Sequence, residues 1–244
     1  MQADSSEKRR VALVTGGASG LGAATCRLLA SEGWRVIVAD VRQAAAETVA
    51  QEVRGAGGEA WASQVDVSSA AAAEQAVRDA VALQGRLDAL VNAAGVDVTK
   101  AAETLTAAEW RQVLGVNLDG PFWMSRAVLP VMREQGSGHI VNVASTAAKR
   151  AWSNAAAYHA SKWGLLGLSH ALHVEARAYG VKVTAIVAGG MRTPFLFDRF
   201  PDLDPAVLQD PECVARTIAF ALAQPAGTVI PELTVLPMGE TSWP

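Results

Sequence analysis

Residues 11–22 have the sequence VALVTGGASGLG, in which an apolar run is followed directly by glycines and small residues. The run at 11–15 predicts a buried strand, and residues 20–32 predict a helix that ends before Gly33. A strand, a glycine-rich turn and a helix in this order are typical of a site for the pyrophosphate of a dinucleotide. Glycine permits close approach of the ligand, and the helix N-terminus attracts an anion. From this stretch alone, a glycine-rich turn without a ligand remains the alternative.

The next apolar run, at 35–39, predicts a strand that ends at Asp40. Asp40 follows the glycine turn by about 20 residues, the spacing at which a carboxylate accepts hydrogen bonds from an adenosine ribose. Such a carboxylate repels a 2′-phosphate, and residues 16–22 contain no Lys or Arg, so the sequence predicts NAD as cofactor. Arg42, two residues after Asp40, is the one residue here that is compatible with the extra phosphate, so NADP remains the alternative cofactor.

Apolar runs alternate with helical segments along the rest of the chain. We predict strands at 11–15, 35–39, 60–65, 88–92, 139–144, 181–187 and 232–236. We predict helices at 20–32, 43–55, 69–84, 106–134, 154–179 and 211–223. This alternation predicts one α/β domain over residues 1–244, built on a Rossmann-type, doubly wound, mostly parallel seven-stranded sheet with helices on both faces.

Right-handed crossovers place the carboxyl ends of parallel strands at one edge of the sheet, where ligands bind. The residues that fall at predicted strand ends are Asp40, Asp66, Asn92, Ser145 and Ala188.

Tyr158 and Lys162 lie four residues apart in the predicted helix 154–179 and therefore share one face of it. An ammonium close to a phenol favours the phenolate and lowers the pKa of the tyrosine, which gives a proton donor that works near neutral pH. Tyrosine and lysine at this spacing more often lie on a solvated helix face. The pair alone is therefore weak evidence for a catalytic site and gains support only from the other motifs.

Taken together, these motifs resemble the short-chain dehydrogenase/reductase family over nearly the whole chain. Residues 15–22 are similar to its cofactor loop, Asp66-Val67 to the pair that meets the adenine ring, and residues 92–95 to its strand-four signature. Residues 188–190 are Ala-Gly-Gly where the family usually has Pro-Gly, but Thr193 still matches the residue that contacts the nicotinamide amide. The resemblance implies cofactor contacts at Gly16, Ser19, Gly20, Leu21, Gly22, Asp40, Asp66, Val67, Asn92, Ala93, Gly95, Tyr158, Lys162, Gly189, Met191 and Thr193.

The resemblance also implies a catalytic set of Asn117, Ser145, Tyr158 and Lys162. In that set Tyr158 exchanges a proton with the substrate oxygen, Ser145 hydrogen-bonds that oxygen, and Lys162 keeps the phenol acidic and holds the nicotinamide ribose. Asn117 holds a water that connects Lys162 to solvent. The expected activity is NAD(H)-dependent interconversion of a secondary alcohol and a ketone.

The substrate is expected to lie between the segment from Ser145 to Tyr158 and a lid at 194–210. We predict substrate contacts from Lys149, Arg150, Trp152 and Phe195. Cations beside aromatic residues favour a partly apolar substrate that carries an anion, and solvated loop charges are the alternative interpretation.

Two other functions are open at this point. A 3-oxoacyl carrier-protein reductase that uses NADPH is the enzyme alternative, but Gly136 and Tyr179 stand where such reductases of this family commonly have basic residues. A cofactor-binding regulator without turnover is the non-enzyme alternative, and the intact catalytic set argues against it. No Gly-x-Ser-x-Gly motif is present, which disfavours a serine hydrolase.

The composition of the chain limits which binding partners and which cellular location are expected. A net charge of −3 argues against binding to nucleic acid or an anionic membrane, and no apolar run reaches the roughly 18 residues of a membrane span. Residues 1–8 predict a disordered arm, without the apolar segment of a signal peptide. The two cysteines, Cys26 and Cys213, lack the spacing of a disulfide framework or metal site, so we expect no metal and a cytoplasmic location.

The predicted helices 106–134 and 154–179 carry apolar residues on more than one face. A sheet covers only one face of each, so we expect these helices to pair with their copies in a homotetramer, with a homodimer as second choice. The C-terminal tail, 237–244, is also apolar and is expected to contact a neighbouring subunit.

Overall fold

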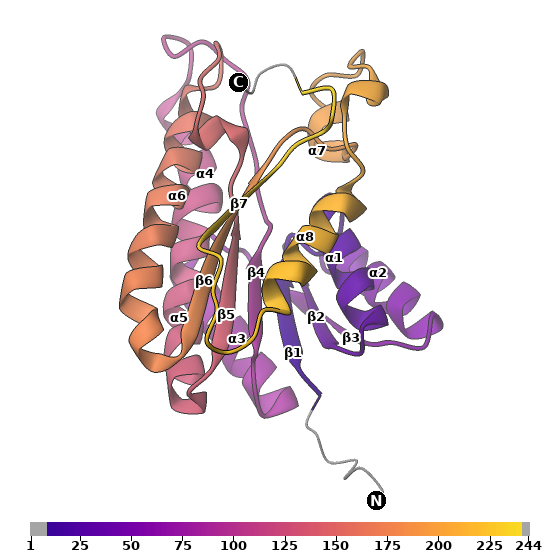
Figure 1. The fold of residues 1–244 in the computed structure, drawn as a ribbon. Helices are drawn as coiled ribbons and strands as arrows, with labels where there is room; N and C mark the ends of the chain where they lie inside the picture. Colours follow the sequence, from indigo (N-terminus) through magenta and orange to yellow (C-terminus); the bar gives the residue numbers. More distant parts are fainter. Residues whose placement is uncertain (1–8, 241–244) are drawn as a thin grey trace, which may run out of the picture.

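The computed structural model of the protein describes residues 9–240, so the predicted arm at 1–8 and the last four residues of the tail lie outside the described residues. Seven strands form one sheet in the order β3-β2-β1-β4-β5-β6-β7, and every neighbouring pair is parallel (Figure 1). The strands are β1 (Val11–Thr15), β2 (Arg35–Asp40), β3 (Glu59–Gln64), β4 (Ala89–Asn92), β5 (Gly138–Val143), β6 (Val181–Ala188) and β7 (Glu232–Val235). The predicted α/β fold with a doubly wound sheet is confirmed.

The helices between the strands follow the prediction closely, with short additional turns. They are α1 (Gly20–Ser31), α2 (Gln43–Gly55), α3 (Ala70–Gln84), α4 (Ala107–Leu114), α5 (Gly120–Gln135), α6 (Ala156–Ala176), α7 (Pro194–Phe197) and α8 (Pro211–Leu222). Single 3₁₀ turns occupy η2 (Thr146–Ala148), η3 (Arg177–Tyr179) and η4 (Pro205–Val207). The predicted helix 106–134 is α4 and α5 joined by a π-helical turn, η1 (Gly115–Asp119). None of the helices within residues 9–240 is long and apolar enough to span a membrane.

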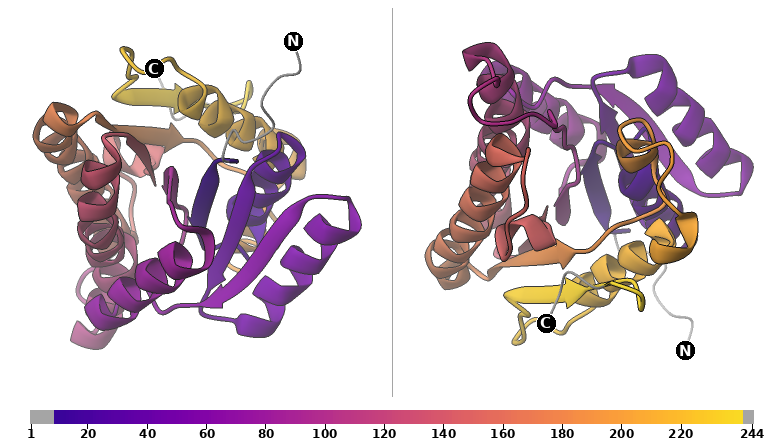
Figure 2. Two further views of the ribbon diagram at one scale, coloured as in Figure 1. Left: turned by 90° about the horizontal axis from the view of Figure 1, so that it is seen from below. Right: turned by 90° about the horizontal axis from the view of Figure 1, so that it is seen from above.

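Both faces of the sheet are covered at its centre, which explains why β1 and β4 are buried along their whole length, whereas the edge strands β3 and β7 are partly exposed. In β1, Ala12 and Val14 pack into a core with α1, α2 and α8, whereas Val11 and Leu13 pack into a second core with α3, α5 and α6. This alternation is the two-residue period of a strand, and it produces the two helical layers seen in Figure 2.

The turn after β1 requires glycine for steric reasons. A Cβ atom on Gly22 would lie 2.1 Å from the carbonyl oxygen of Gly16, and Gly16 itself has a φ of +65°. The start of α1 is therefore pressed against the end of β1, which an L side chain at either position would prevent.

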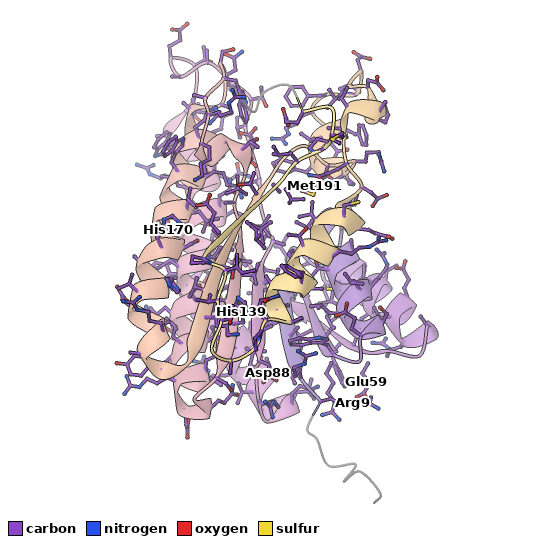
Figure 3. All side chains as sticks on the ribbon, viewed as in Figure 1. Arg9, Glu59, Asp88, His139, His170 and Met191 are labelled. Atoms are coloured by element: carbon purple, nitrogen blue, oxygen red, sulfur yellow. The ribbon has the colours of Figure 1, made fainter. Side chains whose placement is uncertain are left out.

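The strand ends meet at one edge, at the point where the connections leave β1 and β4 in opposite directions. There the Thr15 hydroxyl accepts hydrogen bonds from the backbone N–H groups of Ala93 and Ala94, at 3.2 and 3.3 Å, and joins the two loops. Figure 3 shows Met191 at this edge, whereas His139 and Asp88 lie lower in the molecule. Ligand-binding chemistry is expected at the upper edge.

Candidate active site

A cavity of about 1390 Å³ opens along the carboxyl ends of the strands. Drug-sized ligands occupy pockets of about 300–1,000 Å³, so this cavity has room for a large cofactor and a small substrate side by side. Most of the predicted site residues line it: Gly16, Ser19, Gly20, Leu21, Gly22, Asp40, Asp66, Val67, Ala93, Gly95, Ser145, Trp152, Tyr158, Lys162, Gly189, Met191, Thr193 and Phe195. Asn92, Asn117, Lys149 and Arg150 do not.

Tyr158 and Lys162 stand one turn apart on α6, with the lysine Nζ 5.6 Å from the centre of the phenol ring. Burial raises the pKa of Tyr158 to about 12, opposed by a hydrogen bond with Ser145. Burial also lowers the pKa of Lys162 to about 8, and its Nζ donates to the carbonyl oxygen of Val143 at 2.8 Å. The sequence predicted a tyrosine pKa lowered by the ammonium. In this structure desolvation has the larger effect on the pKa of both groups, because burial disfavours their charged forms.

Ser145 is placed beside Tyr158 by the chain just after β5. It is the N-cap of η2, and its hydroxyl accepts a hydrogen bond from the N–H of Ala147 at 3.1 Å. That bond leaves the hydroxyl hydrogen for a second contact, which in this structure is the hydrogen bond with Tyr158, so the two hydroxyl groups lie side by side on the cavity wall.

Asn117 lies in the π-helical turn η1 and is fully buried. Its Nδ2 donates to the carbonyl of Val96 at 2.8 Å and to Ser161 Oγ at 3.1 Å, and its Oδ1 accepts from the N–H of Val96 at 2.8 Å. The side chain therefore fixes the segment that follows β4 against α6. Its predicted role in holding a water for Lys162 stays a prediction.

Asn92 is also buried and does not line the cavity, and its predicted contact with the cofactor stays a prediction. Its Nδ2 donates to Asn142 Oδ1 at 2.8 Å, and Asn142 in turn donates to Ser169 Oγ at 2.9 Å. The amide thus ties β4 to β5 and α6 beneath the cavity, and the cavity wall at this level is formed by Ala93 and Gly95 instead.

The other end of the cavity carries Asp40, Arg42 and Ser19. Asp40 accepts hydrogen bonds from the N–H of Ala18 at 3.2 Å and from the N–H and Nε of Arg42 at 3.0 and 3.1 Å. Arg42 Nη2 donates to Ser19 Oγ at 3.0 Å. Asp40, which favours NAD, and Arg42, which leaves NADP as the alternative, are therefore in direct contact at the predicted adenosine position.

The prediction that Lys149 and Arg150 meet the substrate is not supported by their positions. After η2 the chain turns so that Lys149 Nζ lies 2.7 Å from Glu232 Oε1 on β7, and neither cation lines the cavity. Trp152 and Phe195 do line it. The anionic substrate inferred from these two cations loses its basis.

Two charged residues that the sequence analysis did not pair line the cavity instead. Arg199, from the lid segment, places Nη1 2.5 Å from Oδ2 of Asp97, which follows β4. The guanidinium also lies 3.8 Å from the ring centre of Phe195. No local pattern could have revealed this pair, because its members are far apart in the sequence and only the folded lid brings them together.

His159, on α6, holds the loop that carries Trp152. Its Nε2 accepts from the N–H of Trp152 at 3.0 Å, and its Nδ1 lies 3.0 Å from the carbonyl of Ala147, which assigns the proton to Nδ1. No group of His, Cys, Asp and Glu that could hold a metal occurs within residues 9–240.

Comparison with known proteins identifies the class. The family model described as short chain dehydrogenase matches residues 10–204. The chain is 44% identical over 178 residues to D-threitol dehydrogenase of Mycolicibacterium smegmatis, covering 72% of this chain and 68% of the relative. It is 38% identical over 199 residues to levodione reductase of Leifsonia aquatica, covering 80% of this chain and 74% of the relative.

A metagenomic short-chain oxidoreductase, solved in complex with NADP, has a similar structure. Its TM-score is 0.84 at 34% sequence identity, with 94% of this chain and 97% of that chain covered. The protein therefore belongs to the short-chain dehydrogenase/reductase family. It is an oxidoreductase of the kind that acts on alcohols and ketones with a nicotinamide cofactor.

The depressed pKa of Lys162 predicts a pH-dependent stability. The folded protein releases the Lys162 proton near pH 8 and the unfolded chain near pH 10.5, so between these values the unfolded chain binds more protons and stability rises with pH. The difference between the two pKa values corresponds to about 3 kcal/mol. Urea unfolding of wild type and Lys162→Met across this range should show wild type gaining up to that amount relative to the variant. Parallel profiles would contradict the assignment.

Proposed function

We propose that the protein is an NAD(H)-dependent oxidoreductase that interconverts a secondary alcohol and a ketone. The observation that carries the proposal is the meeting of Ser145, Tyr158 and Lys162 on the wall of a cavity whose other end holds the glycine turn and Asp40. One end supplies a proton donor, and the other end fits a dinucleotide.

The fit to a dinucleotide rests on features of the cavity itself. The N-terminus of α1 opens onto it, and Ser19, the N-cap residue, makes no side-chain capping hydrogen bond, so first-turn N–H groups are available to a pyrophosphate. A Cβ on Gly20 would lie 3.1 Å from Thr193 Cγ2, so the base of the lid closes over the glycine turn. The bound cofactor would supply hydride transfer at its nicotinamide.

The residues of the chain then handle the oxygen and the proton. Ser145 and Tyr158 both donate hydrogen bonds to the carbonyl oxygen of the substrate, and Tyr158 gives its proton to that oxygen as it becomes an alkoxide. A tyrosine pKa of about 12 keeps the phenol protonated at neutral pH, which suits this direction. The Lys162 ammonium, 5.6 Å from the ring, stabilises the phenolate that remains.

Removal of the Tyr158 hydroxyl tests this mechanism. Tyr158→Phe should lower kcat by on the order of 100-fold or more, because the positioned proton donor is lost, while NADH affinity stays close to wild type. Steady-state kinetics and NADH fluorescence titration measure the two quantities. The only other tyrosine, the half-exposed Tyr179, provides the matched control Tyr179→Phe, which should keep both. A Tyr158→Phe enzyme with wild-type kcat would remove Tyr158 from the reaction.

NAD preference is the second part of the proposal. The Asp40 side chain is only 6% exposed and is held by three donors, so its carboxylate is fixed at the end of β2 and would repel the 2′-phosphate of a cofactor whose ribose binds there. Arg42 is the residue able to receive that phosphate, but Asp40 and Ser19 already engage it.

Opposite changes at these two residues test the preference. Asp40→Asn removes the repelling charge and should lower the ratio of kcat/KM for NADH over NADPH on the order of tenfold, whereas Arg42→Ala should raise it. Both ratios come from initial rates with one ketone at saturation. A wild type that prefers NADPH, or a ratio unmoved by Asp40→Asn, would refute NAD as the cofactor.

The relatives favour small alcohols and ketones as substrates, since their names specify threitol and levodione. The carrier-protein reductase alternative is disfavoured because Gly136 and Tyr179 stand just before β5 and β6, as the sequence indicated. Ser145, Tyr158 and Lys162 lie together on the cavity wall, which argues against a cofactor-binding regulator without turnover. Binding of NADH without reduction of any ketone would favour it.

We further propose a homo-oligomer, with a tetramer ahead of a dimer. Trp110 on α4, Phe122 on α5, and Trp163 and Val174 on α6 are exposed, and together they give the outer helices an apolar surface. A self-complementary contact between copies of these helices would bury it. The described part of the tail contacts its own chain, since a Cβ on Gly189 would lie 2.7 Å from Pro237 Cδ; Trp243 and Pro244 lie outside the described residues.

Light scattering at micromolar concentration should show an assembly in wild type. Trp163→Glu places a carboxylate in the proposed contact and should reduce the mass. Leu83→Glu changes a residue of similar exposure on α3, 56% against 54%, and should leave the mass unchanged. A monomeric wild type would refute the assembly, and equal behaviour of the two variants would refute its location.

A further inference from the structure

Asp97 and Arg199 form a partly buried ion pair at the substrate end of the cavity. The Asp97 side chain is 9% exposed and that of Arg199 is 18% exposed, although the arginine belongs to the lid. The guanidinium is held by its Nε, which donates to the carbonyl of Phe195 at 2.8 Å, and by the Phe195 ring beneath it. The Phe195 ring centre lies 5.9 Å from that of Tyr158, so the pair stands next to the proposed proton donor.

Each partner of the ion pair keeps a buried polar atom without a hydrogen bond. Within residues 9–240, Asp97 Oδ1 and Arg199 Nη1 are buried and have no hydrogen-bond partner, even though Nη1 lies close to Oδ2. Buried polar groups without partners are rare in folded proteins and indicate a missing ligand or water. Asp97 Oδ1 is therefore an acceptor without a donor, and Arg199 Nη1 carries two N–H groups of which only one can point at Oδ2, so a second N–H is left over; both side chains line the cavity.

The charges of the pair decide what kind of group fits. The carboxylate and the guanidinium neutralise one another, so the site offers no net attraction to an anion, and Asp97 repels a carboxylate placed beside it. A hydroxyl group suits both leftover atoms, because it donates to Asp97 Oδ1 and accepts from Arg199 Nη1. Trp152 and Phe195, which also line the cavity, provide apolar contacts for a carbon skeleton.

We propose that Asp97 and Arg199 bind a second hydroxyl group of a neutral substrate, so that the enzyme selects hydroxyketones and the corresponding diols. The reacting oxygen is held by Ser145 and Tyr158, and the second hydroxyl is held a few bonds away by the ion pair. The pair takes no part in hydride or proton transfer. This inference rests on the proposed function, and it replaces the anionic substrate suggested by Lys149 and Arg150.

A set of small ketones tests the proposal with wild-type enzyme and NADH. Butanone carries no second polar group, acetoin adds one hydroxyl beside the carbonyl, and an isomer carries the hydroxyl one carbon further away. Acetoacetate carries a carboxylate instead. We expect kcat/KM for the better hydroxyketone to exceed that for butanone by about tenfold or more, the effect of a hydrogen bond to a charged group. Acetoacetate should be the poorest substrate.

Asp97→Asn separates recognition from a structural role. The variant removes the carboxylate and leaves the Arg199 cation uncompensated, so the ratio of kcat/KM for the hydroxyketone to that for butanone should fall about tenfold, while the ratio for acetoacetate to butanone should rise. Arg199→Met should weaken the hydroxyketone without improving acetoacetate. The matched control is Asp202→Asn, an exposed lid carboxylate outside the cavity lining, which should leave all ratios unchanged. Melting temperatures establish that each variant is folded.

The outcomes distinguish this inference from the proposed function. If butanone is reduced but neither hydroxyketone is preferred, or if Asp97→Asn lowers all ketones equally, the inference is overturned and the oxidoreductase activity stands. If no ketone is reduced with NADH or NADPH, the proposed function is overturned, and this inference with it.

Discussion

A parallel sheet that is covered by helices on both faces leaves only the ends of its strands open for chemistry. In this protein every strand of the seven-stranded sheet is parallel, and the two apolar cores fill the space between sheet and helices. Polar groups on β1 and β4 are therefore confined to the edge where Thr15 joins the loops after the two strands. Because the connections diverge at that point, the loops separate and a cavity forms between them.

Desolvation sets the character of the site that this edge creates. It raises the pKa of Tyr158 and lowers the pKa of Lys162, so it disfavours charge on both groups. The proposed proton donor therefore stays neutral, and the nearby amine is only weakly basic. Such groups suit a site that binds a ligand through hydrogen bonds. In the proposed mechanism, the charge that stabilises a phenolate comes from Lys162 in its protonated form, and burial lowers the pKa of that group to about 8.

Two ion pairs stand at opposite ends of the cavity and differ in their surroundings. Arg42 beside Asp40 is 58% exposed, so its guanidinium is solvated and contributes little to stability. Arg199 beside Asp97 is 18% exposed and is stacked on Phe195, so desolvating it is costly unless further hydrogen bonds satisfy it. The first pair is the one proposed to select the cofactor, and the second is the one proposed to select the substrate.

The sequence by itself determined the order and direction of the elements, because periods of two and of about 3.6 residues are local properties of strands and helices. It also placed Tyr158 and Lys162 on one helix face and Asp40 at a strand end, since these follow from spacing alone. The tertiary structure decided what spacing cannot encode. Lys149 pairs with Glu232, Asn117 forms hydrogen bonds with the backbone of Val96, and Arg199 pairs with Asp97. The tertiary structure also decided that burial outweighs the lysine charge at Tyr158, because desolvation depends on every segment packed around a group and not on its neighbours in the chain.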